Sequence, residues 1–276
     1  MLSFYSGPLA QSVEQRTFNP WVVGSIPTGP TRRKEYEVRV FVDVGAHFGE
    51  SLVEVLKPNY GFNRIICIEP SYIAQKKLAK FKDKRIEIER WGAWDQEEMA
   101  VLHSAGSIGA SLYSDKPKSS ANVEYIRLKS IKKYFDSEFN ESHEVFLKVN
   151  VEGAEYAILN SLFQKSSPRW RINSVLLSLD IRKVPSLRHY EKELLNMLKK
   201  RKITYFHREN ADPATSIRIW LKKVGVQEKT SHFYPWARYF ASVPIWYLIR
   251  IAIKNFVPKN LWLFLALKFG PNRIKN

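Results

Sequence analysis

The sequence predicts an α/β fold with a doubly wound, mostly parallel sheet, followed by a basic, aromatic, helical appendage at the C-terminal end. The alternation of segments predicts this class, and the composition and the cysteine count limit what else the chain can be. Apolar runs rich in valine, isoleucine and leucine alternate with segments of helical periodicity from residue 38 onward. A chain of 276 residues with 45% hydrophobic content can bury a sizeable core. The lone cysteine, Cys67, excludes a disulfide framework and a thiol-ligated metal cluster and indicates a cytosolic protein.

The regular pattern begins with two strands and two helices. Residues 38–45 (VRVFVDVG) form an almost continuous apolar run, which is typical of a strand buried on both faces. Residues 50–57 (ESLVEVLK) have helical spacing, and residues 64–70 (RIICIEP) predict the second strand. Residues 71–81 (SYIAQKKLAKF) predict the second helix, with Ser71 as its N-terminal cap.

The middle of the chain predicts two further major strands around an insertion. Residues 85–94 (RIEIERWGAW) read as the third strand. Residues 99–105 (MAVLHSA) and 123–131 (VEYIRLKSI) are shorter and alternate in polarity, as in a hairpin-like insertion. Residues 144–151 (EVFLKVNV) predict the fourth major strand, and residues 155–163 (EYAILNSLF) its helix.

The domain is expected to end with a strand, a helix and a closing pair of strands. Residues 173–181 (NSVLLSLDI) predict the fifth strand, and residues 190–201 (YEKELLNMLKKR) an amphipathic helix. Residues 202–208 (KITYFHR) and 216–223 (SIRIWLKK) are expected to pair antiparallel.

Glycines and acids gather where the first two strands end. Asp43, Gly45 and Gly49 surround the first strand-to-helix turn, where glycine permits a sharp turn and close approach of a ligand. The spacing is not GxGxxG, so the dinucleotide fingerprint is absent. Glu69 ends the second strand, where a carboxylate can accept both hydroxyls of a ribose. The simpler alternatives are glycines needed for packing alone and a solvated charge at a strand end.

Four motifs give the chain a family resemblance: FVDVGAHFGES, CIEPS, WGAWD and, above all, LKVNVEGAE. On these motifs it resembles the FkbM family of S-adenosylmethionine-dependent methyltransferases over roughly residues 38–222. The resemblance implies a class I methyltransferase fold of the Rossmann-like kind, with a methyltransferase domain at residues 35–228. It also implies methylation of hydroxyl groups on polyketides, sugars or glycans.

The resemblance implies a cofactor site in which Asp43, Gly45 and Gly49 line the amino-acid end of S-adenosylmethionine. Glu69 is then expected on the ribose, with Trp94 and Asp95 near the adenine. His47 lies within the glycine loop, where contact with a ligand and simple exposure are equally expected, whereas His103 reads as a structural side chain. The expected cofactor-binding residues are Asp43, Gly45, Ala46, His47, Gly49, Glu69, Trp94 and Asp95.

The expected catalytic residues are Asn150, Glu152 and Glu155, which follow the fourth major strand. A hydroxyl acceptor needs a base for its proton, and a carboxylate within hydrogen-bond reach is suitable. Two glutamates in the first turn of a helix also stabilise that helix without any chemistry. The family usually has aspartate where this chain has Asn150, and asparagine cannot take a proton. A catalytically decayed, cofactor-binding relative is therefore an open alternative.

Asp180 and Arg182 end the fifth strand, where family members place groups on the substrate side. We therefore expect both residues to contact the acceptor. No pattern of histidines or carboxylates predicts a metal site.

The net positive charge lies in the second part of the chain. Residues 1–164 hold 21 Lys and Arg against 21 Asp and Glu, whereas residues 165–276 hold 23 against 6. Residues 229–276 form a basic, aromatic tail, in which residues 232–269 predict two cationic amphipathic helices. The tail is expected to contact an anionic membrane surface or, almost equally, to pack on the domain or in a dimer interface.

Residues 7–31 (GPLAQSVEQRTFNPWVVGSIPTGPT) fit no predicted element and resemble the translation of a transfer-RNA gene. Residues 1–34 are therefore expected to be a non-native or poorly ordered segment.

The sequence as a whole predicts an S-adenosylmethionine-dependent O-methyltransferase that acts on a sugar or glycan hydroxyl, with a lipid-linked glycan as one candidate. The expected location is the cytoplasm, with the inner membrane face as a candidate peripheral site. A nucleic-acid methyltransferase, whose basic C-terminal part would bind phosphates, is the alternative activity.

Overall fold

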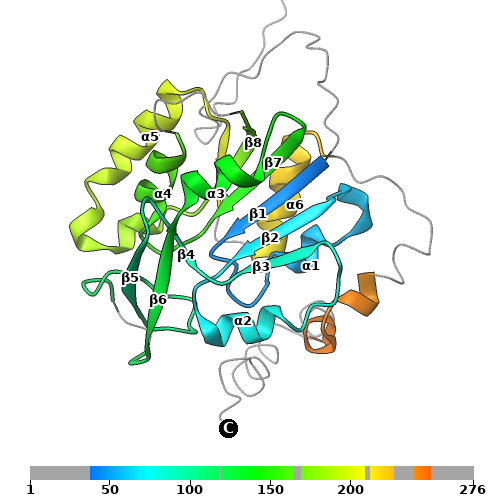
Figure 1. The fold of residues 1–276 in the computed structure, drawn as a ribbon, viewed down its shortest axis with the longest axis horizontal. Helices are drawn as coiled ribbons and strands as arrows, with labels where there is room; N and C mark the ends of the chain where they lie inside the picture. Colours follow the sequence, from blue (N-terminus) through cyan, green and yellow to red (C-terminus); the bar gives the residue numbers. More distant parts are fainter. Residues whose placement is uncertain (1–37, 118–119, 164–168, 209–211, 227–238, 250–276) are drawn as a thin grey trace, which may run out of the picture.

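The computed structural model describes residues 38–117, 120–163, 169–208, 212–226 and 239–249. Its centre is a six-stranded sheet with strand order β3-β2-β1-β7-β8-β9, in which every neighbouring pair is parallel (Figure 1). Helices cover both faces, so the predicted doubly wound α/β fold is confirmed. The strands are β1 Val38–Val44, β2 Arg64–Ile68, β3 Ile86–Glu89, β7 His143–Val149, β8 Arg171–Leu177 and β9 Tyr205–His207.

Alternate side chains of the central strands enter two hydrophobic cores. In β1, Val40, Val42 and Val44 face the core that contains α3 to α5, whereas Phe41 faces the core that contains α1, α2 and α6. Burial on both faces explains why the strand sequences are nearly continuous apolar runs. The helices are α1 Leu52–Val55, α2 Tyr72–Leu78, α3 Ile131–Glu138, α4 Glu155–Leu162, α5 Tyr190–Lys200 and α6 Pro213–Lys223.

A second, three-stranded sheet with order β4-β6-β5 lies beside the carboxyl edge of the main sheet (Figure 1). It consists of β4 Gly92–Trp94, β5 Glu98–His103 and β6 Val123–Ser130. β5 and β6 pair antiparallel, which confirms the predicted hairpin-like insertion. The single strand expected at residues 85–94 is wrong, because the chain leaves the main sheet after Glu89 and joins β6 as β4.

The expected closing pair of antiparallel strands is also wrong. β9 runs parallel to β8, and residues 216–223 belong to helix α6. Asp212 caps α6, since its side chain accepts a hydrogen bond from the Thr215 backbone N–H at 3.1 Å, and Pro213 occupies the first turn. Ile217, Trp220 and Leu221 are buried on one face of this helix. The predicted cap at Ser71, by contrast, is present at the start of α2.

The described part of the C-terminal tail, residues 239–249, forms two short helices that pack on the domain. Tyr239, Val243 and Tyr247 are buried in the same core as α1, α2 and α6. The Tyr239 hydroxyl donates to the Val53 carbonyl at 2.8 Å, and the Lys82 backbone N–H donates to the Ser242 carbonyl at 2.9 Å. The alternative of packing on the domain therefore holds for this segment.

Several expectations concern residues outside the described part of the chain. They are the segment at residues 1–34 with its resemblance to a translated transfer-RNA gene, and the tail beyond residue 249. Among the described residues, no helix has the length and apolar character needed to cross a bilayer.

Candidate active site

The candidate site lies at the carboxyl edge of the sheet, where strand order reverses between β1 and β7. The Asn150 backbone N–H donates to the Val44 carbonyl, and the Gly45 backbone N–H donates to the Ile68 carbonyl, both at 3.0 Å. The ends of β1, β2 and β7 therefore meet at one point, which is where open α/β sheets bind ligands. Gly45 is required there for packing, because a Cβ at this position would lie 2.0 Å from the Asn150 carbonyl oxygen.

A buried ion pair joins β1 to β7 below this crevice. Lys148 Nζ donates to Asp43 Oδ1 at 2.5 Å and also reaches the Gly45 carbonyl at 3.3 Å. Asp43 is fully buried, and its second oxygen, Oδ2, has no hydrogen-bond partner among the described residues. A buried carboxylate oxygen without a partner is costly, so Asp43 Oδ2 is a candidate contact for a bound cation or donor.

Glu69, at the end of β2, holds the glycine loop in place. Its Oε2 accepts from the His47 backbone N–H and its Oε1 from the Ser71 backbone N–H, each at 2.8 Å. Burial raises the pKa of this carboxyl above its ordinary value. Each oxygen keeps one lone-pair direction, so Glu69 can still accept two hydroxyl groups.

His47 is more constrained than an exposed loop residue. Its backbone is left-handed, with φ 49°, and its Nδ1 lies 2.9 Å from Glu50 Oε1. Burial acts to lower the pKa of His47, but the hydrogen bond with Glu50 and the charges of Glu50 and Glu69 outweigh it, so the pKa is raised. Nε2 is buried without a partner among the described residues. His47 therefore presents one ring nitrogen for a ligand.

The other two positions of this loop are accounted for by packing. A Cβ at Gly49 would lie 2.7 Å from the Phe81 ring, so this glycine allows the loop to pack against the end of α2. Ala46 is buried in the same core as Phe81.

Glu155 begins α4 and is fully buried. Its Oε2 accepts from the Gly153 backbone N–H at 3.0 Å, whereas Oε1 has no partner among the described residues. Burial and the nearby charge of Asp180 raise the pKa of Glu155 to about 8. This carboxyl therefore titrates slightly above neutral pH, within the range that general acid–base catalysis uses.

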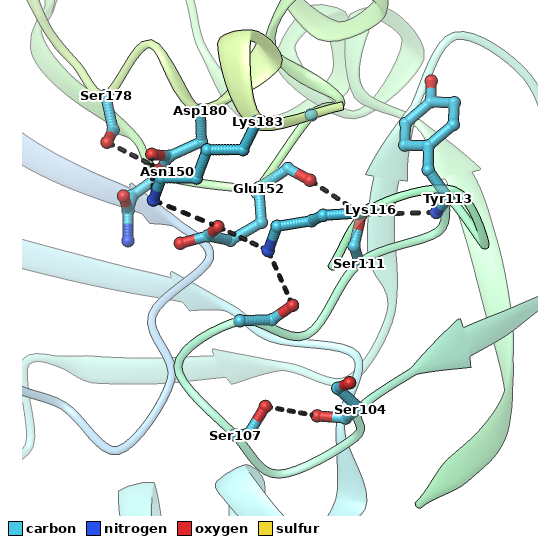
Figure 2. Close-up of polar contacts among 12 residues, drawn as sticks. Ser104, Ser107, Ser111, Tyr113, Lys116, Asn150, Glu152, Ser178, Asp180 and Lys183 are labelled. Carbon is cyan, nitrogen blue, oxygen red and sulfur yellow. Dashed lines mark hydrogen bonds and ion pairs between the residues drawn. The ribbon is translucent and has the colours of Figure 1, made fainter. Parts of the chain in front are cut away.

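Glu152 is held by a buried lysine from the insertion (Figure 2). Lys116 Nζ donates to Glu152 Oε2 at 2.6 Å and to the Gly109 carbonyl at 2.7 Å. Ser111 Oγ donates to the Glu152 carbonyl at 2.7 Å. Lys183 reaches the same Oε2 at 3.4 Å from the opposite side. Glu152 therefore connects β7 to the loop between β5 and β6.

Asn150 contacts an arginine that follows β9, the edge strand of the sheet. Its Oδ1 accepts from the Arg208 guanidinium at 3.1 Å, and Arg208 directly follows β9. The amide group of Asn150 is therefore oriented by a cation, which suits a role in orienting other groups.

Asp180 and Arg182 lie in the 3₁₀ turn Asp180–Lys183 after β8. Asp180 is buried, accepts from Ser178 Oγ at 2.7 Å and pairs with Lys183 at 2.6 Å. Arg182 is more than half exposed and pairs with Glu191. An open cleft of 510 Å³ lies beside this turn, with Glu152, Arg182 and Lys183 among its lining residues.

The chain was compared with known proteins. The family model described as the methyltransferase FkbM domain matches residues 43–202, which is more than half of the chain. The chain belongs to the FkbM methyltransferase family. The crystal structure of the methyltransferase FkbM from Methylobacillus flagellatus KT, at 2.20 Å resolution, is similar with 23% identity and a TM-score of 0.31. That match covers 49% of this chain and 31% of the other. No curated protein matches the chain.

Within the FkbM domain, the structure brings most of the expected site residues to one edge, but not all of them. Trp94 ends β4 and packs between the core of α3 to α5 and the small sheet. Asp95 follows it. Burial raises the pKa of Tyr113 to about 12, and the charges of Glu155, Asp115 and, to a smaller extent, Asp95 add to this shift. The backbone of His103 pairs with that of Ser111. Asp95 therefore lies on the side of the site that contains Tyr113 and Glu155.

Three further site residues were not predicted from sequence. Lys148 had a signal, because a lysine in one buried strand and Asp43 in another suggest an ion pair. Lys116 lies in a loop without periodicity, where no pattern in the sequence indicates its contact. Arg208 ends the segment that was predicted as a closing strand, and the wrong pairing expected for that strand did not indicate its contact with Asn150. Among the described residues, no group of three or more His, Cys, Asp or Glu side chains is arranged to hold a metal ion.

Proposed function

We propose that this protein transfers a methyl group from S-adenosylmethionine to a hydroxyl of a sugar or glycan acceptor, with lipid-linked glycans among the candidates. The observation that carries the proposal is the set of buried, unpartnered polar atoms around the point where strand order reverses. Asp43 Oδ2, His47 Nε2 and Glu155 Oε1 all lack partners among the described residues.

The residues present fit the cofactor. Glu69 keeps two acceptor directions, as a ribose with two hydroxyls requires, and its position is fixed by the His47 and Ser71 backbone N–H groups. Asp43 Oδ2 suits the cationic amino-acid end, since an unpaired buried carboxylate oxygen favours a positive donor. When bound, S-adenosylmethionine supplies an electrophilic methyl group on a sulfonium.

Glu155 is the best candidate for the base. Methyl transfer to a hydroxyl is an in-line displacement, and the acceptor oxygen must lose its proton as the new bond forms. Glu152 is already engaged by Lys116, and Asn150 cannot take a proton. Glu155 has a free oxygen and a pKa of about 8, so its ionised form, a minority at pH 7 and the majority above pH 8, can accept that proton.

The deciding experiment is incubation with cofactor labelled in its methyl group and fractionated glycan, lipid and RNA extracts. Label in a glycan or lipid-linked glycan fraction supports the proposal. Label in RNA would favour nucleic-acid methylation instead. Cofactor binding without transfer to any fraction would favour the decayed relative.

Glu69→Gln tests the cofactor site directly. We expect calorimetry to show S-adenosylmethionine binding weakened about tenfold or more, because charge-assisted hydrogen bonds to the ribose are lost. Glu98→Gln is the matched control, since Glu98 is an exposed carboxylate on β5, and it should bind like the wild type. Equal affinity for all three proteins would remove Glu69 from the site.

We also propose a cytoplasmic location with peripheral contact to an anionic membrane. The support is local. The packed segment at residues 239–249 turns Phe240, Ile245 and Ile249 outward, and the chain after Glu228 contains no acidic residue.

A further inference from the structure

Four of the eight residues that line the cleft beside the candidate site carry a positive charge. The cleft has a volume of 510 Å³, which lies in the usual range for small-molecule sites. Glu152, after β7, and the turn after β8 form one side, and the loop between β5 and β6 forms the other. The lining residues are Ile108, Gly109, Lys116, Pro117, Glu152, Arg182, Lys183 and Arg188.

Three of the four cations in the cleft have carboxylate partners. Lys116 pairs with Glu152 and Lys183 pairs with Asp180, each at 2.6 Å. Arg182 pairs with Glu191. These pairs compensate one another's charge, so the cleft keeps one net positive charge, which belongs to its fourth cation.

Arg188 is that fourth cation. Its Nε donates to the Arg182 carbonyl at 3.0 Å, which fixes the plane of the guanidinium. No carboxylate in the described part of the chain pairs with Arg188, and its two terminal nitrogens have no partner there. An oriented guanidinium with two free N–H directions is suited to bind an oxyanion through two parallel hydrogen bonds.

We propose that this cleft binds an oxyanion on the acceptor, with Arg188 as its anchor and Lys183 beside it. A sugar carboxylate and a phosphate ester share this chemistry. The inference rests on the proposed function, because only that function makes the ligand of this cleft the methyl acceptor. The cleft shares Glu152 with the candidate active site. An anionic group held there would fix the sugar relative to Glu155, which supplies the alignment that displacement at carbon requires.

The charge balance explains why a neutral sugar is a poor occupant. Four cations around one cleft repel each other, and pairing to Glu152, Asp180 and Glu191 removes most but not all of that repulsion. The hydroxyls of a neutral sugar can accept hydrogen bonds from Arg188, but they leave its positive charge uncompensated. An anion removes the remaining repulsion and satisfies the guanidinium.

Calorimetry with glucuronate, glucose 1-phosphate and glucose tests the inference. We expect at least one anionic sugar to bind about tenfold more tightly than glucose, because charge-assisted hydrogen bonds add to the affinity. Arg188→Gln should abolish that preference, and the exposed position of Arg188 predicts an unchanged melting temperature. Tighter binding of glucuronate would identify a carboxylate, and tighter binding of glucose 1-phosphate a phosphate ester.

The matched control is Arg127→Gln, an exposed arginine of β6 that pairs with Glu97 away from the cleft. It should keep the preference for anionic sugars. Equal binding of glucose and both anionic sugars to the wild type, or an unchanged preference in Arg188→Gln, would overturn the inference.

This outcome is separable from that of the proposed function. Anion preference that depends on Arg188 but no cofactor binding would leave the cleft assigned and reject methyl transfer. Cofactor binding and methylation of neutral glycans without any anion preference would support methyl transfer and reject the assignment of the cleft.

Discussion

The acid–base chemistry of Glu155 is strongly altered by its surroundings. Burial and Asp180 raise its pKa to about 8, compared with an ordinary value of 4.5. Between these two values the unfolded chain has lost the proton and the folded chain has kept it. The folded state therefore binds more protons, and its stability falls as pH rises from about 4.5 to about 8.

Glu155→Gln should remove this fall in stability with rising pH, because the amide resembles the protonated acid and does not ionise. We expect its melting temperature to exceed that of the wild type by roughly 5 °C or more at pH 8.5, and the gap to close toward pH 4.5. Calorimetric scans across this range measure it. A gap that stays constant with pH would show that Glu155 is ionised in the folded protein. Glu98→Gln, at an exposed site, should show no gap.

Sequence reasoning identified which acids reach the site, but it did not show what holds them. Strand ends can be read from apolar runs, so Asp43, Glu69 and Glu155 were placed correctly at the carboxyl edge. The partner of Glu152 is Lys116, which lies 36 residues earlier in an irregular loop. A contact of that kind depends on how the loop folds back, and local periodicity contains no information about it.

At the scale of elements, the loop between β5 and β6 forms one wall of the site. It is fastened by the Lys116–Glu152 pair, by Ser111 on the Glu152 carbonyl, and by the Ser186 backbone N–H on Asp115 at 2.9 Å. The first of these contacts is buried, with both side chains less than one-tenth exposed. Its loss leaves a charge inside the protein, so we expect it to contribute most to holding the loop.

Lys116→Met tests this expectation. We expect urea denaturation to show a loss of about 3 kcal/mol, because the buried Glu152 carboxylate loses its main partner and Lys183 reaches it only at 3.4 Å. Lys132→Met is the matched control, since Lys132 and Asp136 form an i,i+4 pair whose carboxylate is 45% exposed. That change should cost about 0.5 kcal/mol or less. Similar losses for both variants would contradict a structural role for the buried pair.

The elements that sequence reasoning missed are those where two periodicities coincide. Ile217, Ile219 and Leu221 alternate like a strand, but Ile217, Trp220 and Leu221 form the buried face of α6. Asp212 before Pro213 was the available helix-start signal. The division between β3 and β4 left no such signal, because an apolar run reads the same whether or not the chain changes sheets.

At the scale of the whole molecule, the domain includes part of the basic tail. Both faces of residues 239–249 are apolar, so periodicity could not decide which face packs. Tyr239, Val243 and Tyr247 turn into the core and leave Ile245 and Ile249 exposed by 71% and 51%. The apolar side chains of this segment are therefore divided between a buried face and an exposed face. Leu248 is partly buried against the core, and the rest of the predicted amphipathic helices beyond residue 249 lies outside the described residues.

The outward face of this segment gives the last prediction. If Ile245 and Ile249 enter the headgroup region, their replacement by serine should weaken binding to phosphatidylglycerol vesicles by about tenfold or more, since each buried isoleucine contributes about 1.5 kcal/mol or more. Cosedimentation measures the binding, and the buried tyrosines keep the segment packed in the double variant. Ile219→Ser, which changes an exposed isoleucine of α6, is the matched control and should bind like the wild type. Equal binding by the wild type and the double variant would mean that this face does not touch lipid. A loss of binding in Ile219→Ser as large as in the double variant would point to a general loss of surface apolarity. Weak binding to neutral phosphatidylcholine, together with loss of binding at high salt, would show that the basic residues act with the isoleucines.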